Sequence, residues 1–261
     1  MRLGAIRTVL ALAAIEDMEL ESVDVSPAFL NGEIEEEVYT KVPEGFAIGD
    51  DGSPQWALRL LKSLYGLKKA GRCWSRKLHA TLESLCFRRT ESGHSFYTHD
   101  RDDAKIFVLV CVDNLTLASN SPATLVKLRQ DLASHFEIRY LGPTEFILGI
   151  KVEWDRPNRI IYLSQSAYIQ SILDEHLPVP SKAMSSVATP TLENARLSLR
   201  DSPTTAEEIA KMSNSKYKEI IGKLLCVESG TRPDISHALH VLCKFLADDT
   251  WVPYGTSSVT L

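Results

Sequence analysis

Two aspartates stand where a carboxylate could do chemistry. Asp24 lies near the end of an alternating stretch at 19–25, and Asp113 directly follows the apolar run 106–112. Carboxylates brought together at two strand ends supply the hard oxygen ligands that divalent cations prefer. Two Mg²⁺ ions at such a site stabilise both the attacking and the leaving oxygen in phosphoryl transfer. An Asp beside a turn is more often only a turn residue, so the spacing alone leaves both interpretations open.

The elements that must position these aspartates follow from the apolar patterns. Helical spacing predicts helices at 5–15, at 71–86 and from Ser121-Pro122 onward. Alternating or continuous apolar runs predict strands at 19–25, 37–42, 56–64, 106–112, 115–118, 146–154 and 159–163. Asp113-Asn114 is expected to form the tight turn of a hairpin, because both residue types tolerate a left-handed backbone. This order predicts an α+β fold with a mostly antiparallel sheet.

The C-terminal third reads differently. A helix is expected from Ser164 to about Glu175, followed by a stretch at 178–206 that is rich in Pro, Ser and Thr and reads as a linker. Helical patterns at about 206–229 and 232–247 come next, and the tail from 248 is expected to be frayed. His237 and His240 share a predicted helix but lack a third ligand, so no metal site is expected there.

Charge and composition exclude a globally basic nucleic-acid binder. The chain has 261 residues, 44% of them hydrophobic and 24% charged, with a formal net charge of −5. A polyanion would therefore have to be held by a local patch or through metal ions. One such patch combines basic residues with one aromatic ring: Lys62, Lys68, Lys69, Arg72, Arg76 and Lys77 with Trp74. This composition is suited to phosphate contact and base stacking. A solvated helix face is an equal alternative.

The cysteines and the apolar runs bear on compartment. Five scattered cysteines without a Cys-x-x-Cys pair indicate neither a disulfide framework nor structural zinc. The apolar run at 9–15 is followed by acidic residues and has no cleavage site, so it predicts an amphipathic helix rather than a secretory signal. No stretch approaches the ~20 apolar residues of a membrane span. The expectation is an intracellular protein, cytoplasmic or nuclear, with no membrane partner.

Several short sequence motifs resemble those of a known family. The segment 24–32 reads DVSPAFLNG and is similar to the Asp-Val-x-x-Ala-Phe-Leu-Asn-Gly segment of copia-type retrotransposon reverse transcriptases. Further words follow in that family's order: VPEGF at 42–46, LKSLYGLK at 61–68, FILGI at 146–150, LSQ at 163–165 with Tyr168-Ile169, and TRPDISHA at 231–238. The match covers roughly residues 6–246, and the chain is identified as a member of that family.

The resemblance implies a right-hand polymerase fold and a nucleotide site. Asp24 and Asp113 resemble the catalytic aspartates that hold two Mg²⁺ ions, and Val25 would lie beside the metal. Ser26 and Phe29 would contact the incoming dNTP: the backbone N–H groups of Val25 and Ser26 near the triphosphate, and the Phe29 ring under the sugar, where it excludes a 2′-hydroxyl. For Phe29, a core aromatic is an equally open interpretation.

The same resemblance implies contacts to an RNA template and a DNA primer. Lys68, Lys69, Arg72 and Trp74 lie in the segment that matches the family's template-facing turn. Leu148 and Gly149 lie in the segment that matches its primer-grip hairpin, where the alternative is an apolar strand whose Gly149 permits a close backbone approach.

The implied domains are a palm with partial fingers at 1–177, a linker at 178–205, a helical thumb or connection region at 206–247 and a tail at 248–261. The family's first finger strands lie upstream of the matched region, so the fingers are expected to be largely missing.

The sequence departs from the family at its second aspartate. Where the family has Tyr-Val-Asp-Asp, residues 111–114 read CVDN, so Asn114 replaces a catalytic carboxylate and Cys111 replaces the aromatic ring at the primer end. The family's Lys-Gln-Ala-Pro-Arg is KKAGR at 68–72. A site with one charge fewer holds cations less well, so impaired catalysis is expected.

Three hypotheses about function follow. The first is an RNA-directed DNA polymerase with two Mg²⁺ ions, impaired at Asn114. The second is an inactive retrotransposon remnant that acts at most as a nucleic-acid- or protein-binding module. The third, a metal-dependent phosphohydrolase on the same carboxylates, ranks last because no His or Lys at a matching position supports it. Nothing in the sequence indicates an oligomeric state.

Overall fold

The fold is described from a computed structural model of the chain. It describes residues 2–43, 45–46, 56–91, 93–101, 104–176, 205, 207, 216–244 and 246. These residues form two compact units, one made by the chain up to 148 together with 152–162, the other by 149–151 and the chain from 163 onward. The predicted linker at 178–205 and the tail at 248–261 lie outside the described residues, so those two predictions stand untested.

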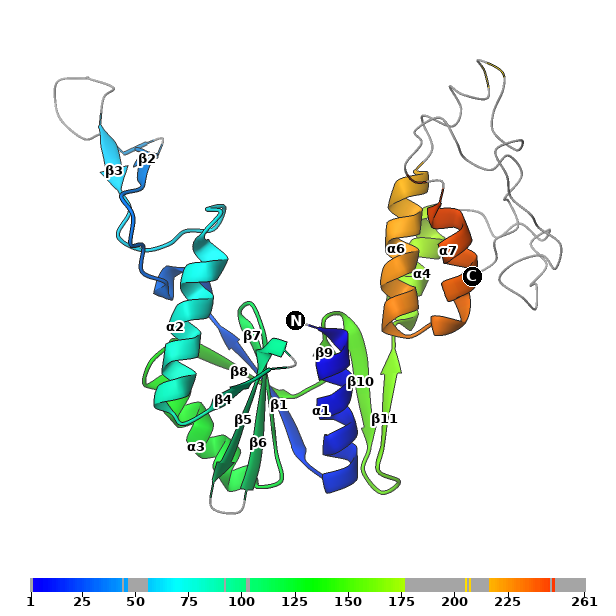
Figure 1. Ribbon diagram of the computed structural model, residues 1–261, viewed down its shortest axis with the longest axis horizontal. Helices are drawn as coiled ribbons and strands as arrows, with labels where there is room; N and C mark the ends of the chain where they lie inside the picture. The colour runs from blue at the N-terminus through cyan, green and yellow to red at the C-terminus, as the bar shows by residue number, and fades with distance from the viewer. Residues whose placement is uncertain are drawn as a thin grey trace. The chain divides into compact units, whose positions relative to one another are not determined.

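A six-stranded sheet in the order β4-β5-β6-β7-β1-β8 organises the first unit (Figure 1). Every pairing within it is antiparallel, which confirms the predicted mixed α and β fold with an antiparallel sheet. The strands are β1 (Glu19–Val25), β4 (Arg88–Thr90), β5 (Gly93–Arg101), β6 (Ala104–Cys111), β7 (Asn114–Ser119) and β8 (Ile138–Pro143).

Helices cover both faces of this sheet (Figure 1). On one face α2 (Ala70–Ser84) and α3 (Pro122–Ala133) bury the main core, whose largest side chains include Trp74, Leu78, Leu117 and Leu132. On the other face α1 (Leu3–Glu16) contacts β6 and β7 and buries its own Ile6, Val9, Leu10 and Ala13. Burial of this apolar area is the main free energy that holds the layers together.

The helices predicted at 5–15, at 71–86, from Ser121-Pro122 and from Ser164 are confirmed, as is the strand at 19–25. α1 and α2 start two residues and one residue earlier than predicted, and α2 ends two residues earlier, at Ser84. Three strands were missed: β4, β5 and β8. Their residues are mainly polar or exposed, and the alternation that marks a half-buried strand is therefore weak there.

The β6–β7 hairpin corrects the predicted Asp113-Asn114 turn. Cys111 pairs with Asn114, so the two-residue loop is Val112-Asp113 and Asn114 is the first residue of β7. Val112 takes the positive φ, 57°, although β-branched residues rarely adopt that backbone. The turn is thus one residue earlier than the sequence suggests, and Asn114 lies on the strand beside Asp24.

Two smaller sheets complete the strand inventory of the described residues. β2 (Tyr39–Lys41) and β3 (Ala57–Arg59) form a two-stranded antiparallel sheet and are shorter than the strands predicted at 37–42 and 56–64. β9 (Phe146–Ile147), β10 (Ile150–Asp155) and β11 (Ile160–Ser164) form the other sheet. The single strand predicted at 146–154 is wrong, because a turn at Leu148-Gly149 divides it. A 3₁₀ turn, η1 (Ala28–Asn31), follows β1.

The second unit is mainly helical in its described part, apart from the residues of β10 and β11 that belong to it. α4 (Ser166–His176), α6 (Tyr217–Gly230), η3 (Pro233–Ile235) and α7 (Ser236–Cys243) surround a small core that includes Ile172, Ile221, Leu224 and Leu239. The single helix predicted at 206–229 is wrong, because Lys216 is not helical and α6 begins at Tyr217. The helix predicted at 232–247 corresponds to η3 and α7, and α7 ends at Cys243. No described helix has the length and apolar character needed to span a membrane.

Candidate active site

Strand register brings the predicted catalytic residues together. β1 and β7 are antiparallel neighbours, and in their register Asp24 faces Asn114. The Val25 N–H donates a hydrogen bond of 2.8 Å to the Asp113 carbonyl. Facing residues in an antiparallel pair lie only about 4.5–5.5 Å apart at Cα, so Asp24, Asp113 and Asn114 converge at one end of the sheet.

Side-chain alternation sets the direction in which these residues point. Val23 and Leu115 are a facing pair, and both are buried in the core beneath α2 and α3. Side chains alternate along a strand, so Asp24 and Asn114 point to the opposite face. Farther along the strands that face buries Leu20, Leu109 and Ala118, whereas Asp24 and Asp113 are half-buried and Asn114 is exposed.

Both carboxylates accept local hydrogen bonds. Ser26 Oγ donates to Asp24 Oδ2 at 2.5 Å, and Asn114 Nδ2 donates to Asp113 Oδ1 at 3.0 Å. In the part of the chain that the structure describes, no Lys, Arg or His side chain forms an ion pair with either aspartate. Two carboxylates without an internal cation form a hard-oxygen donor set that fits Mg²⁺, with one carboxylate fewer than the family pattern.

The backbone N–H groups of Val25 and Ser26, which were expected near a triphosphate, have partners within the fold. Val25 N donates to Asp113 O, and Ser26 N donates to the Glu137 carbonyl at 3.1 Å. Both amides are therefore occupied within the fold. The Val25 side chain is a buried hydrocarbon without a ligand atom, so Val25 could offer a metal only its backbone carbonyl.

Trp74 also differs from its predicted role. The indole is 2% exposed and packs edge-on against Phe136, with ring centroids 5.1 Å apart. Its Nε1 donates to the Val112 carbonyl at 2.5 Å. Stacking on a base needs a free ring face, so the prediction that Trp74 binds the template is wrong for this structure.

Phe29 lies beside the site on η1. It is half-buried against the main core, and its ring lies 4.6 Å from that of exposed Tyr65 at an angle of 58°. Gly32, which ends η1, has an ordinary φ of −78°. A Cβ there would meet Cys73 Cβ and Trp74 N at 2.9 Å, so close packing on α2, rather than turn geometry, requires this glycine.

Cys111 stands where the family has an aromatic ring. It is half-buried at the end of β6. Burial raises the pKa of its thiol above the ordinary value of 9, and the charge of Asp113 raises it further. The thiol therefore stays neutral near pH 7, which makes Cys111 a poor nucleophile and a poor metal ligand there.

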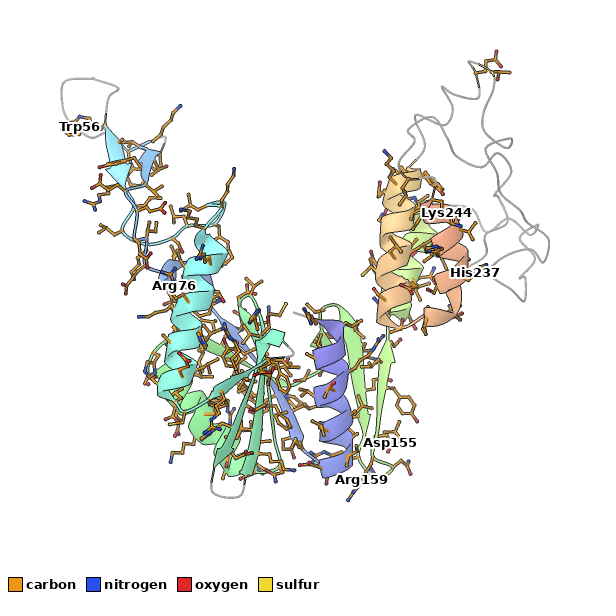
Figure 2. All side chains as sticks on the ribbon, viewed as in Figure 1. Trp56, Arg76, Asp155, Arg159, His237 and Lys244 are labelled. Carbon is orange, nitrogen blue, oxygen red and sulfur yellow. The ribbon has the colours of Figure 1, made fainter. Side chains whose placement is uncertain are left out.

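The basic patch at the start of α2 is partly neutralised by an acidic segment. Lys69 pairs with Glu36, Arg76 pairs with Glu35, and Lys77 Nζ lies 3.8 Å from a Glu33 carboxylate oxygen. Lys68 and Arg72 are exposed and form no ion pair with the described residues. A cavity of about 350 Å³ lies between the two segments, lined by Ile34, Glu36, Leu67, Lys68, Arg72 and Arg76 among others. Figure 2 marks Arg76 on α2.

The turn at Leu148-Gly149 presents its residues to solvent. Leu148 is 50% exposed and has a φ of 53°, and Gly149 has a φ of 78°. Nothing lies within 4 Å of a Cβ built on Gly149. The positive φ, rather than a close backbone approach, is therefore what favours glycine there.

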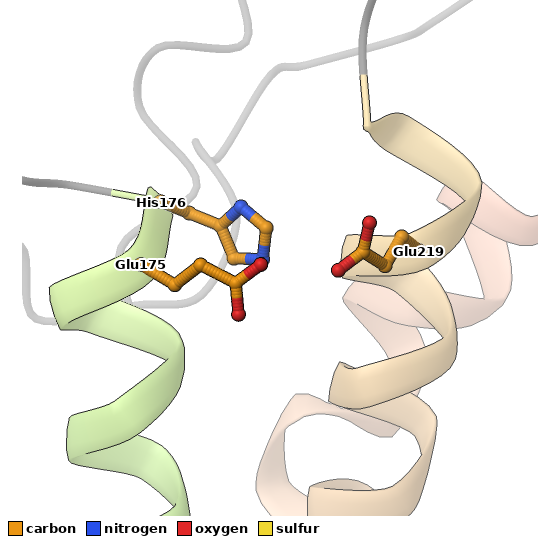
Figure 3. A group of neighbouring side chains, drawn as sticks. All are labelled: Glu175, His176 and Glu219. Carbon is orange, nitrogen blue, oxygen red and sulfur yellow. The ribbon is translucent and has the colours of Figure 1, made fainter.

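A second acidic cluster lies in the helical unit. Carboxylate and imidazole atoms of Glu175, His176 and Glu219 come within 4.8 Å of one another (Figure 3). Lys223 Nζ donates to Glu175 Oε2 and to Glu219 Oε1, both at 2.7 Å, and lies 3.1 Å from His176 Nε2. The place that a metal ion would take is thus filled by the chain's own ammonium group.

Two of these features were missed from the sequence. The acidic run EIEEE at 33–37 lies before the basic segment, and this complementarity of charge is a signal that could have revealed their pairing. Glu219 and Lys223 are four residues apart on α6, the spacing of a helical ion pair. The approach of Glu175 from α4 has no such local signal.

Comparison with known proteins identifies the family of the chain. Residues 1–192 match the family of reverse transcriptases (RNA-dependent DNA polymerases). The chain is 36% identical over 247 residues to the retrovirus-related Pol polyprotein from transposon TNT 1-94 of Nicotiana tabacum, and 30% identical over 242 residues to that from transposon RE1 of Arabidopsis thaliana. These alignments cover 94% and 93% of the chain but 18% and 16% of the relatives.

A shorter relative is covered more fully. The transposon Ty5-1 protein of Saccharomyces cerevisiae is 30% identical over 230 residues, which is 87% of this chain and 70% of that protein. The chain spans less than a fifth of the length of the two plant polyproteins, so it corresponds to one region of such a protein. The chain belongs to the reverse transcriptase (RNA-dependent DNA polymerase) family, as a domain of the copia-type retrotransposon kind.

Proposed function

We propose that this chain is a nucleotidyl-transfer domain of a copia-type Pol polyprotein, an RNA-directed DNA polymerase with an impaired metal site. The first unit would be the palm, and the helical unit would belong to the thumb or connection region. The observation that carries the proposal is the register of β1 and β7, which sets Asp24 opposite Asn114 and joins Val25 to Asp113. The two segments that match the family's aspartate motifs thus lie side by side at one end of the sheet.

Asp24 and Asp113 are the residues that would hold Mg²⁺, with the Val25 carbonyl as a further oxygen. When bound, the metal ions neutralise the charge that develops as a primer 3′-hydroxyl displaces pyrophosphate from a dNTP. Ser26 Oγ holds one oxygen of Asp24 by its hydrogen bond and so limits the rotation of that carboxylate. The half-buried Phe29 ring, beside exposed Tyr65, is proposed to contact the sugar of the dNTP.

The nucleic-acid contacts are proposed at two further places. Lys68 and Arg72 have no internal counterion among the described residues and are suited to template phosphates. Lys69 would join them after leaving Glu36. The exposed turn at Leu148-Gly149 is proposed to contact the primer, as the resemblance implies.

Asn114 is the reason for proposing weak catalysis. Its carbonyl carries no net charge, and its amide N–H donates to Asp113 Oδ1, so it takes up one of the oxygens that a metal ion needs. A carboxylate in its place could not donate this hydrogen bond. The same observation favours a second candidate function, a nucleic-acid-binding module without catalysis.

The test is primer extension on an RNA template with Mg²⁺ and then Mn²⁺. We expect little extension by the native chain and at least about tenfold more by Asn114→Asp, because a second carboxylate raises cation affinity. Asp24→Asn added to Asn114→Asp is the matched control and should remove the gain. If the folded Asn114→Asp chain extends no primer with either metal, the polymerase proposal fails and the binding-module alternative remains.

A further inference from the structure

Trp74 touches both segments that carry the two aspartates. Its Nε1 donates to the carbonyl of Val112, the residue immediately before Asp113. Its ring packs edge-on against Phe136, and the next residue, Glu137, accepts a hydrogen bond at its carbonyl from the Ser26 N–H, two residues after Asp24. One buried side chain therefore connects the β6–β7 turn with the end of β1.

The turn that Trp74 contacts has an unfavourable backbone of its own. Val112 has a φ of 57° and its side chain is 52% exposed, so burial of an apolar group does not compensate for the conformation. Two-residue hairpin turns that require a positive φ at this position favour glycine, and β-branched residues are outliers there. A conformation of this kind persists only where surrounding contacts enforce it.

The indole hydrogen bond is the side-chain contact that can enforce it. Trp has one donor and no acceptor, and a buried indole N–H without a partner is costly. Rotation of the Val112-Asp113 peptide out of the turn would leave Trp74 Nε1 unpaired inside a core where the ring is 2% exposed. The cost of this unpaired N–H therefore disfavours turn conformations in which the Val112-Asp113 peptide has rotated and Asp113 has moved.

We infer that Trp74 is a positioning residue for Asp113: its indole N–H fixes the Val112 carbonyl and thereby sets where the Asp113 carboxylate lies relative to Asp24. This inference concerns the proposed metal site and rests on that function for its purpose. The geometry itself is present without a metal ion. Because α2 also carries Arg72, and Lys68 lies two residues before its first residue, the same helix joins the proposed phosphate contacts to the aspartate turn.

The test compares Trp74→Phe with a matched control, Trp154→Phe. Phenylalanine keeps a six-membered ring against Phe136 and removes the N–H donor together with part of the indole. Trp154 lies on β10 in the same unit and is half-buried, and its buried Nε1 has no hydrogen-bond partner. Trp154→Phe therefore makes the same change of ring without losing such a bond. The measurement is amide hydrogen exchange of the metal-free full chain.

The Val25 amide reports the turn because it donates to the Asp113 carbonyl. In Trp74→Phe we expect the Val25 amide to exchange about two- to tenfold faster than in Trp154→Phe. The Val108 amide, in the middle of β6, should exchange at the same rate in the two variants. Equal acceleration of Val25 and Val108 would mean general destabilisation and would overturn the inference. So would an unchanged Val25 rate, or an equal effect of Trp154→Phe.

A second variant keeps the test sharp if Trp74→Phe is poorly stable. Glycine accepts a positive φ without strain, so Val112→Gly should need the indole less. The acceleration of Val25 exchange caused by Trp74→Phe should be smaller in the Val112→Gly background, and an equal or larger one contradicts the inference. Because these rates are measured without metal, they decide the role of Trp74 even if primer extension shows no polymerase.

Discussion

Two acidic clusters among the described residues are stabilised in opposite ways. At the end of the six-stranded sheet, Asp24 and Asp113 are positioned by strand register and packing and have no ammonium or guanidinium partner among the described residues. In the helical unit, Glu175 and Glu219 are held by Lys223, whose Nζ lies 2.7 Å from an oxygen of each.

This difference separates a candidate metal site from an ion-pair network. Carboxylates brought close together repel one another, and a nearby cation relieves that repulsion. Lys223, followed by Lys216, lowers the pKa of Glu175 to about 2 by hydrogen bonding, so the second cluster is satisfied by the chain itself. Under the proposed function, the first cluster would be completed by a cation from solution, as a metal-dependent polymerase requires.

The largest effect is expected from a substitution that disrupts the packing beside the first cluster. Gly32→Ala would place a Cβ 2.9 Å from Cys73 Cβ and Trp74 N, so η1 or α2 must move. We expect the first unit to lose about 1–3 kcal/mol of unfolding free energy, as overpacked sites do. Urea unfolding followed by circular dichroism measures it.

The control for this change is Gly71→Ala, on the first turn of α2, where nothing lies within 4 Å of the new Cβ. Alanine favours a helix more than glycine does, so Gly71→Ala should leave stability unchanged or raise it. Equal losses from the two alanines would show that close packing at Gly32 is not what supports the site.

A smaller effect is expected at the basic patch, where acidic side chains of the chain itself compete with a bound polyanion for the same basic residues. Glu35 and Glu36 pair with Arg76 and Lys69, so a bound polyanion must displace them. Replacing both by glutamine should raise affinity for single-stranded RNA about threefold at low salt, with the gain lost at high salt. Fluorescence anisotropy measures it.

The matched control removes the same charge away from that patch. Glu83→Gln with Glu91→Gln lowers the negative charge equally, at the end of α2 and after β4. If this pair raises RNA affinity as much, the gain reflects net charge alone and the acidic segment has no special place in binding.

The smallest expected effect is a pH dependence confined to the second cluster. The folded pKa of Glu175 is about 2 against an ordinary 4.5, so its ion pairs stabilise the fold above about pH 4.5, and this stabilisation is lost as pH falls toward 2. At high pH the raised pKa of Lys223 keeps the pairs until that amine loses its proton.

Glu175→Gln tests this dependence. Because the pairs are exposed, we expect the variant's melting temperature to be lower by only a few degrees at pH 7. The difference between native and variant should vanish near pH 2. A difference that is the same at pH 7 and pH 2 would show that packing, rather than charge, holds this cluster.

The sequence predicted the parts of the site whose residues are local in the chain. The strand at 19–25 alternates clearly, and the family words placed Asp24 and Asp113 as partners before any geometry was known. The predicted position of the turn was wrong because Val112, rather than Asn114, adopts the positive φ. That outcome depends on a contact from Trp74, thirty-eight residues earlier, which no local pattern encodes.

Trp74 shows why surface roles are harder to predict than core positions. Its place among Lys68, Lys69 and Arg72 suggested stacking, yet its spacing with Leu78 and Leu82 puts it on the buried face of α2. Helical periodicity carried the correct information, and the neighbouring charges obscured it. In the same way, basic residues were visible in the sequence, but their pairing with Glu35 and Glu36 required the fold.

The most direct test of the account is Mn²⁺ binding by the Asn114→Asp chain, measured by electron paramagnetic resonance. The account predicts a bound ion whose affinity falls at least about tenfold when Asp24→Asn is added and is unchanged when Glu175→Gln is added. An affinity that does not depend on Asp24 would contradict the claim that the sheet-end aspartates form the metal site.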